Sequence, residues 1–177
     1  SSPFLMVPIA IQAVKHDSAL TTDDEKMLLK WFYYAHMRGH YGMGSSESLL
    51  DADLAIVTRD GTLTELIDRL SQHVRKFEVD ASDIQSKSTR SPFFSMLYFV
   101  LKARGAKDWK TGLTLSDEHL GSAHKIQFHH IFPKSLLAKE SVDPKMINEM
   151  ANMAFMRASN TSYPLFIKYF GNQPPPI

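Results

Sequence analysis

The chain has 177 residues, of which 44% are hydrophobic and 22% are charged, and its net charge is +1. This composition is typical of one compact domain or two small ones with a buried core. No apolar run approaches the roughly 20 residues that cross a bilayer, so we expect a cytoplasmic protein without a membrane partner. The absence of cysteine excludes disulfides and thiolate metal sites. The chain begins at Ser1 rather than Met, and we expect a fragment of a longer protein.

Two helices are expected in the first 40 residues. The segment 3–14 is apolar with few breaks, which predicts a helix buried on much of its surface. Thr22 and Glu25 have the spacing of a capping box, so a second helix should begin there. Its apolar residues recur at helical spacing, and Gly39 should end it.

Two further helices are expected before residue 75. Ser45 or Ser46 can cap the first of them, and the Asp60-Gly61 pair provides its stop. Thr62 can cap the next, in which apolar residues recur at helical spacing over residues 63–74. The first half of the chain is therefore predicted to be a helical scaffold.

A strongly apolar helix is predicted over residues 93–102. Ser91 is a cap, Pro92 occupies the first helical position, and Gly105 follows the last turn. Nearly all faces of this segment are apolar, so we expect the helix to be central in the core.

A strand that ends in two histidines is predicted near residue 130. Ile126 and Phe128 alternate with polar residues, as in a half-buried strand, and His129 and His130 close the run. Neighbouring strand residues point to opposite faces, so the two histidines can serve different tasks. Pro133 should turn the chain into a loop.

Two asparagines follow this strand. Asn152 precedes the apolar run 153–156, which can pair back as the second arm of a hairpin. Asn160 lies in a polar stretch before the expected last helix, 163–170, where its amide oxygen could coordinate a cation.

The run HHIFP at 129–133, followed by Asn152 and Asn160, resembles the motif of the HNH, or ββα-metal, endonucleases. That motif has Asp or His, then His-Ile-x-Pro, a central Asn and a final His or Asn. The wider context is similar to the nuclease part of Gmr-type, type IV restriction proteins of bacteria. In those proteins a ParB-like NTPase domain precedes the nuclease, so we expect such a domain to be missing from this chain.

The resemblance implies a role for each residue of the motif. The catalytic residues would be His130, as general base, and Asn152, which fixes the loop that holds this base. The metal ligands would be His129 and Asn160. Physical chemistry agrees, because a neutral imidazole can accept a proton near neutral pH and a metal with few protein ligands keeps positions open for water and phosphate.

The identity of the metal is left open by the sequence. His129 stands where Asp is more frequent in the family, and the chain lacks the cysteine pairs of the zinc knuckle that many relatives carry. Oxygen ligands favour Mg²⁺, which we expect first, whereas an imidazole ligand also admits Mn²⁺, Ni²⁺ or Zn²⁺.

Positive charge is concentrated near the motif. Residues 84–114 carry six basic residues against one acidic residue, and residues 125–168 carry six against three. Such runs can bind a nucleic-acid backbone, although they are also common on solvated faces. The candidate nucleic-acid contacts are Lys134, Arg157, Arg104, Lys107 and Lys110.

Together these features predict a mainly α protein with a small β-hairpin. We expect a helical scaffold over residues 1–114 and an HNH-like ββα-metal unit over residues 115–177, with one compact domain as the alternative. The expected function is metal-dependent hydrolysis of nucleic-acid phosphodiesters, with DNA in a restriction context as the partner and RNA not excluded. The alternative is an inactive nucleic-acid-binding or assembly module of a larger defence protein.

Overall fold

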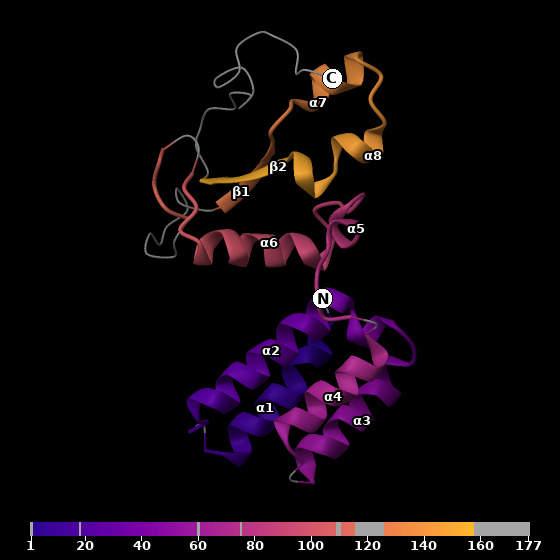
Figure 1. The fold of residues 1–177 in the computed structure, drawn as a ribbon, viewed down its shortest axis with the longest axis vertical. Helices are drawn as coiled ribbons and strands as arrows, with labels where there is room; N and C mark the ends of the chain where they lie inside the picture. The colour runs from indigo at the N-terminus through magenta and orange to yellow at the C-terminus, as the bar shows by residue number, and fades with distance from the viewer. Residues whose placement is uncertain are drawn as a thin grey trace. The chain divides into compact units, whose positions relative to one another are not determined.

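The computed structural model describes residues 2–17, 19–59, 61–74, 76–108, 111–115 and 126–157. The protein is mainly helical and contains a small two-stranded antiparallel sheet (Figure 1), which confirms the expected fold class at this level. The expected helix 163–170 lies outside the described residues. Within the described residues, no helix has the length and apolar character that crossing a membrane requires.

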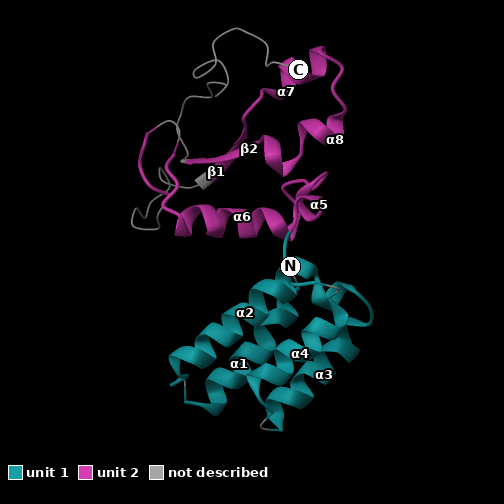
Figure 2. Cartoon of the chain, viewed as in Figure 1, with its two compact units in different colours: residues 1–79 teal, residues 80–177 magenta. Residues whose placement is uncertain are grey.

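The chain divides into two compact units, Ser1–Val79 and Asp80–Ile177 (Figure 2). We call them unit 1 and unit 2. This boundary lies well before residue 114, where the sequence analysis placed it. The physical reason is a helix at 92–103 whose aromatic side chains pack against the hairpin, so that it belongs to the hairpin's own core.

The described residues of unit 1 form four α-helices and two short 3-10 helices. They are η1 (Pro3–Leu5), α1 (Met6–Lys15), α2 (Thr22–Arg38), η2 (His40–Gly42), α3 (Ser46–Thr58) and α4 (Leu63–His73). Their apolar faces meet in a core centred on Trp31, Val57, Leu66 and Leu70, which are at most 1% exposed. The four helices predicted from the sequence are therefore present.

Helix ends in unit 1 follow local side-chain chemistry. Ser45 and Thr62 cap α3 and α4, accepting hydrogen bonds from the N–H groups of Ser48 (3.4 Å) and Glu65 (3.2 Å). The cap of α2 is Thr21, one residue before the expected Thr22. Gly39 ends α2 with φ of +67°, a conformation that costs glycine little.

A polar cluster lies inside unit 1. Asp53 on α3 is fully buried and accepts three hydrogen bonds, from His40 Nε2 (2.8 Å), Tyr41 OH (2.8 Å) and Arg69 Nε (3.0 Å). Burial, followed by the charge of Asp53, raises the pKa of Tyr41, so that its hydroxyl stays a proton donor. The cluster joins α3, α4 and η2 through one carboxylate.

His36 on α2 makes the stability of unit 1 sensitive to pH. Its half-buried ring stacks on Phe32, and its Nδ1 has no hydrogen-bond partner among the described residues. Burial lowers the pKa of His36 below its ordinary value, because a buried ring resists protonation.

The direction of this pH dependence follows from the different pKa of His36 in the folded and unfolded chain. The unfolded chain binds this proton more readily than the folded chain, so the stability that neutral His36 provides is present above about pH 6.5 and is lost as the pH falls. We expect the unfolding free energy of the wild type to fall more than that of His36→Gln between about one pH unit above and one below this value. Urea titrations of both proteins at the two pH values give the comparison. Equal falls would contradict the prediction.

Unit 2 holds the strands and the shorter helices. Its described elements are α5 (Ala81–Ile84), α6 (Pro92–Ala103), β1 (Ile126–His130), α7 (Lys134–Lys139), α8 (Pro144–Ile147), η4 (Met150–Asn152) and β2 (Met153–Arg157). Ser91 caps α6 by accepting from the N–H of Phe93 (3.3 Å), as the sequence predicted. A core of Phe94, Leu115, Met150, Met153 and Phe155 joins α6 to the hairpin.

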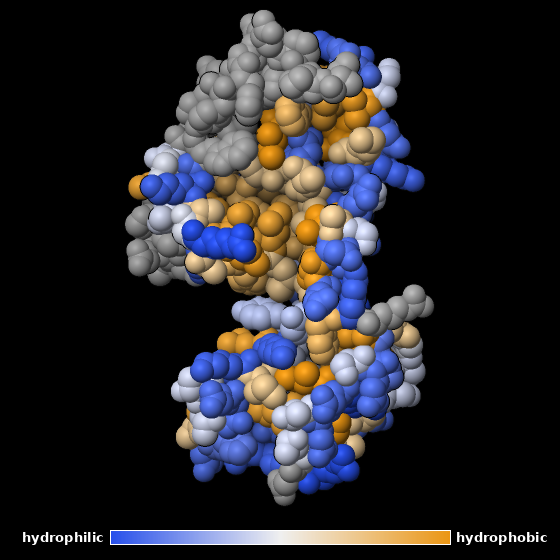
Figure 3. Space-filling view, viewed as in Figure 1, coloured by the Kyte–Doolittle hydropathy of each residue, from blue (hydrophilic) through white to orange (hydrophobic). Residues whose placement is uncertain are grey.

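Helix α6 meets the hairpin with one of its faces. The ring of Phe94 lies 4.7 Å from that of Phe155 and 5.2 Å from that of Phe128, measured between centroids. On the same helix, Phe99 and Val100 are 45% and 46% exposed, and Figure 3 shows apolar side chains gathered over α6. The expectation that this helix is central holds for the face that meets the hairpin, because a two-stranded sheet covers a single face of a helix.

Candidate functional site

The β1–β2 hairpin places the two adjacent histidines on opposite faces. In its antiparallel register, His130 is opposite Met153 and His129 is opposite Ala154. Directly opposed residues share a face, so His130 lies on the face of Met153 and Phe155 that meets α6. His129 lies on the other face, with Gln127, Ala154 and Met156. The hairpin and this separation of the histidines are as predicted.

His130 is the last residue of β1. Its imidazole is half-buried, and its Nε2 lies 3.3 Å from Oδ1 of Asn148, which follows α8. The ring is therefore held at the strand end by one side-chain hydrogen bond, while part of it remains accessible to solvent.

Asn152 fastens the loop that leaves β1. Its Oδ1 accepts from the N–H of Phe132 (2.8 Å), and its Nδ2 donates to the carbonyl of Phe132 (3.2 Å). The same Nδ2 donates to the carbonyl of Ile147 (2.9 Å), and the Asn152 carbonyl accepts from the N–H of Ile131 (2.8 Å). These bonds fix the chain just after His130, which is the geometry that the expected loop-holding role requires.

His129 is half-exposed, and its Nε2 lies 3.3 Å from Oε1 of Gln127. Gln127 Oε1 accepts this bond when the proton lies on Nε2 of His129, and Nδ1 then carries the lone pair that a metal ligand needs. A neutral imidazole with one nitrogen bound to a neighbour is the usual form of a histidine ligand. The donor atoms of His129 thus fit a divalent ion. Among the described residues, no group of three or more His, Asp or Glu side chains could hold a metal.

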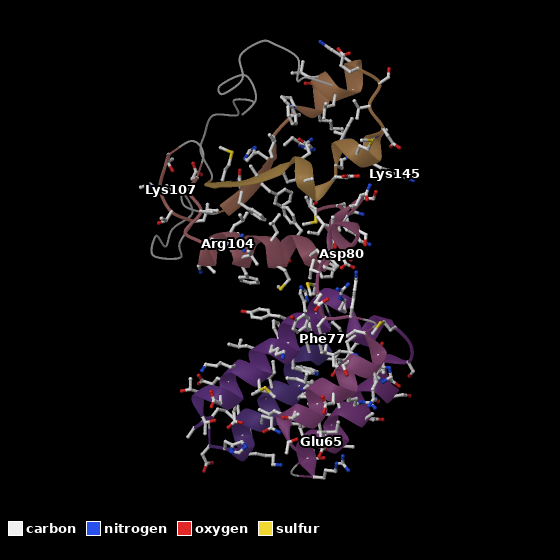
Figure 4. All side chains as sticks on the ribbon, in the orientation of Figure 1. Glu65, Phe77, Asp80, Arg104, Lys107 and Lys145 are labelled. Carbon is white, nitrogen blue, oxygen red and sulfur yellow. The ribbon has the colours of Figure 1, made fainter. Side chains whose placement is uncertain are left out.

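The remaining expected site residues are either outside the described part of the chain or exposed on its surface. Asn160 and Lys110 lie outside the described residues, and Arg157 closes β2 with its side chain outside the description. Lys134 is the exposed first residue of α7. Arg104 and Lys107 are exposed near the C-terminal end of α6 (Figure 4).

The structure brings together His130, Asn152 and the loop that follows His130. It also places Asn148, which the sequence analysis missed, beside His130. Among the described hydrogen bonds, none joins Lys134, Arg104 or Lys107 to either histidine. Asn148, the missed residue, stands 18 positions after His130. The available signal was its place four residues before Asn152, where a short helix starting at Pro144 could bring a second amide beside the motif.

No protein-family model, curated protein or solved structure matches this chain. Its function is therefore inferred from the hairpin, the hydrogen bonds around His130 and the sequence motif.

Proposed function

We propose that this protein is an endonuclease that hydrolyses nucleic-acid phosphodiester bonds at an HNH-type ββα-metal site on the β1–β2 hairpin. The observation that carries the proposal is the set of hydrogen bonds from Asn152 to the loop after His130. The motif assigns this asparagine the task of holding that loop, and a surface histidine pair without function would not require it.

His130 is the proposed general base. It lies at the end of a strand, is partly accessible, and is held by Asn148, so a water molecule can approach its free nitrogen. A positioned imidazole accepts a proton from water efficiently near neutral pH. Asn152 holds the loop that follows His130 in one position, and this keeps the imidazole of His130 at a constant distance from the phosphorus that the water attacks.

His129, with Asn160, is the proposed holder of a divalent ion, Mg²⁺ first and Mn²⁺, Ni²⁺ or Zn²⁺ as alternatives. When bound, such an ion supplies a positive charge that stabilises the negative charge developing on the phosphate and the leaving oxygen. His129 and His130 are adjacent at the end of β1 and lie on opposite faces of the hairpin, so the phosphate that both would serve must lie across the end of the strand.

DNA is the proposed substrate, in the context of a larger restriction protein with an NTPase domain. Lys134, Arg157, Arg104, Lys107 and Lys110 are the proposed phosphate contacts. Lys134 is exposed four residues after His130, so its cation is available to a backbone beside the base.

The proposal is tested by incubating the purified chain with supercoiled plasmid at low salt. Nicked or linear DNA should appear with Mg²⁺, Mn²⁺ or Ni²⁺ and should not appear with a chelator. A His130→Ala preparation made in the same way controls for contaminating nuclease. Cleavage that survives chelation, or no cleavage with any of the ions, would count against the proposed function.

Replacing His129 with alanine should raise the metal concentration needed for half-maximal cleavage by at least about tenfold, because even residues behind the ligands alter metal affinity by that factor. Saturating metal should restore part of the rate. Metal titrations of the cleavage rate for wild type and His129→Ala provide the measurement. An unchanged midpoint would remove His129 from the metal site.

A further inference from the structure

We propose that Asn148 is a positioning residue, which holds the imidazole of His130 with its proton on Nε2 and leaves Nδ1 free to accept a proton. The catalytic meaning of this inference rests on the proposed nuclease function. The geometric part of the inference, which tautomer His130 adopts, does not depend on the nuclease function.

The orientation of the Asn148 side chain is set by its own amide. Nδ2 donates to the carbonyl of Pro144 at 2.7 Å, one turn back in α8. A carbonyl accepts only, so the atom of Asn148 beside Pro144 must be the nitrogen. Oδ1 therefore points to His130, at 3.3 Å from Nε2.

This orientation selects one form of the histidine. A neutral imidazole carries its single proton on Nδ1 or on Nε2, and only the nitrogen with the proton can donate. Because Oδ1 of Asn148 cannot donate, the hydrogen bond requires the proton on Nε2. Nδ1 then keeps the lone pair that a general base needs.

Asn148 is itself held by the same bonds that fasten the loop after His130. Asn152 Nδ2 binds the carbonyl of Ile147, the neighbour of Asn148, and both polar groups of the Phe132 backbone bind the Asn152 amide. Ile147 is only 2% exposed. The path from His130 through Phe132, Asn152, Ile147 and Asn148 returns to His130, so the acceptor and the ring are fixed to one another.

Asn148 could instead serve only as the end of α8, since its backbone N–H also bonds the carbonyl of Pro144. An asparagine that only ends α8 would affect folding but would not determine which ring nitrogen of His130 carries the proton. The state of the imidazole distinguishes the two roles.

The experiment uses the full chain labelled with ¹⁵N-histidine at about pH 8.5, where histidine is neutral. NMR of the ring nitrogens reports which one carries the proton, and the spectrum of His130→Ala assigns the signals. Wild type should show His130 protonated on Nε2. Asn148→Ala should lose this preference.

Kinetics of plasmid cleavage form the second readout. Asn148→Ala should lower kcat by about 10- to 100-fold with KM unchanged, the usual effect of removing a residue that orients a catalytic or ligating histidine. Met146→Ala, on the same short helix and at a 59% exposed position, is the matched control and should change neither kcat nor the ring form.

A wild-type His130 protonated on Nδ1 overturns the inference, and this result needs no substitution that could impair folding. An Asn148→Ala protein with unchanged kcat and unchanged ring form overturns it as well. If wild type shows no cleavage but its Nε2 proton depends on Asn148, the nuclease proposal fails and the positioning role of Asn148 stands.

Discussion

Replacing His130 with alanine is expected to lower the rate of metal-dependent DNA cleavage by about 10²- to 10⁴-fold, the range that a positioned general base contributes. The residue is proposed to take the proton of the attacking water, and no other histidine within the described hairpin shares its face. DNA affinity should be nearly unchanged, because the lost group is not a phosphate contact. Single-turnover cleavage and a binding titration in Ca²⁺ separate the two quantities.

The matched control is His16→Ala, which removes an exposed histidine from unit 1. It should cleave at the wild-type rate. His130 is half-buried with one described side-chain hydrogen bond, so its removal should cost little stability, and both variants should melt near the wild-type temperature. A folded His130→Ala protein with full activity would rule out this residue as the base.

Replacing Asp53 with alanine is expected to destabilise unit 1 by about 3–5 kcal/mol, the cost of removing one partner from a buried charged cluster. Three donors, on His40, Tyr41 and Arg69, lose their acceptor at once. His40 is fully buried and its Nδ1 already lacks a partner among the described residues, so the ring cannot recover the bond in water.

Urea unfolding followed by Trp31 fluorescence measures this effect, with Trp109→Phe as background so that the signal comes from unit 1. Trp31 is 1% exposed, so its emission should shift when the core opens. Asp51→Ala, two residues earlier on α3 and exposed, should change the midpoint little. Equal midpoints for the two variants would show that the cluster contributes no net stability.

Only part of the proposed site could be predicted from local sequence patterns. The hairpin was predictable, because alternation marks β1 and an apolar run marks β2, and the HHIFP motif singled out His129, His130 and Asn152. Asn148 was not predictable. Its hydrogen bond to His130 spans 18 residues and depends on where the loop containing α7 and α8 returns.

In unit 1, the helices could likewise be predicted from the sequence, whereas the buried cluster around Asp53 could not. Asp53 stands in a helix among ordinary polar and apolar residues, and a buried carboxylate has the same sequence signature as an exposed one. Only the packing of α3 against α4 and η2 brings His40, Tyr41 and Arg69 around it, from 12 to 16 positions away.

By itself, the sequence determined where most helices of this protein begin and end, since caps, glycines and prolines act on backbone groups within a few residues. It also determined the hairpin arms and the absence of any thiolate chemistry. Tertiary structure alone decided that α6 belongs with the hairpin and that the chain divides after Val79. It also decided which amide faces His130, because such contacts depend on the path of the whole chain rather than on neighbouring residues.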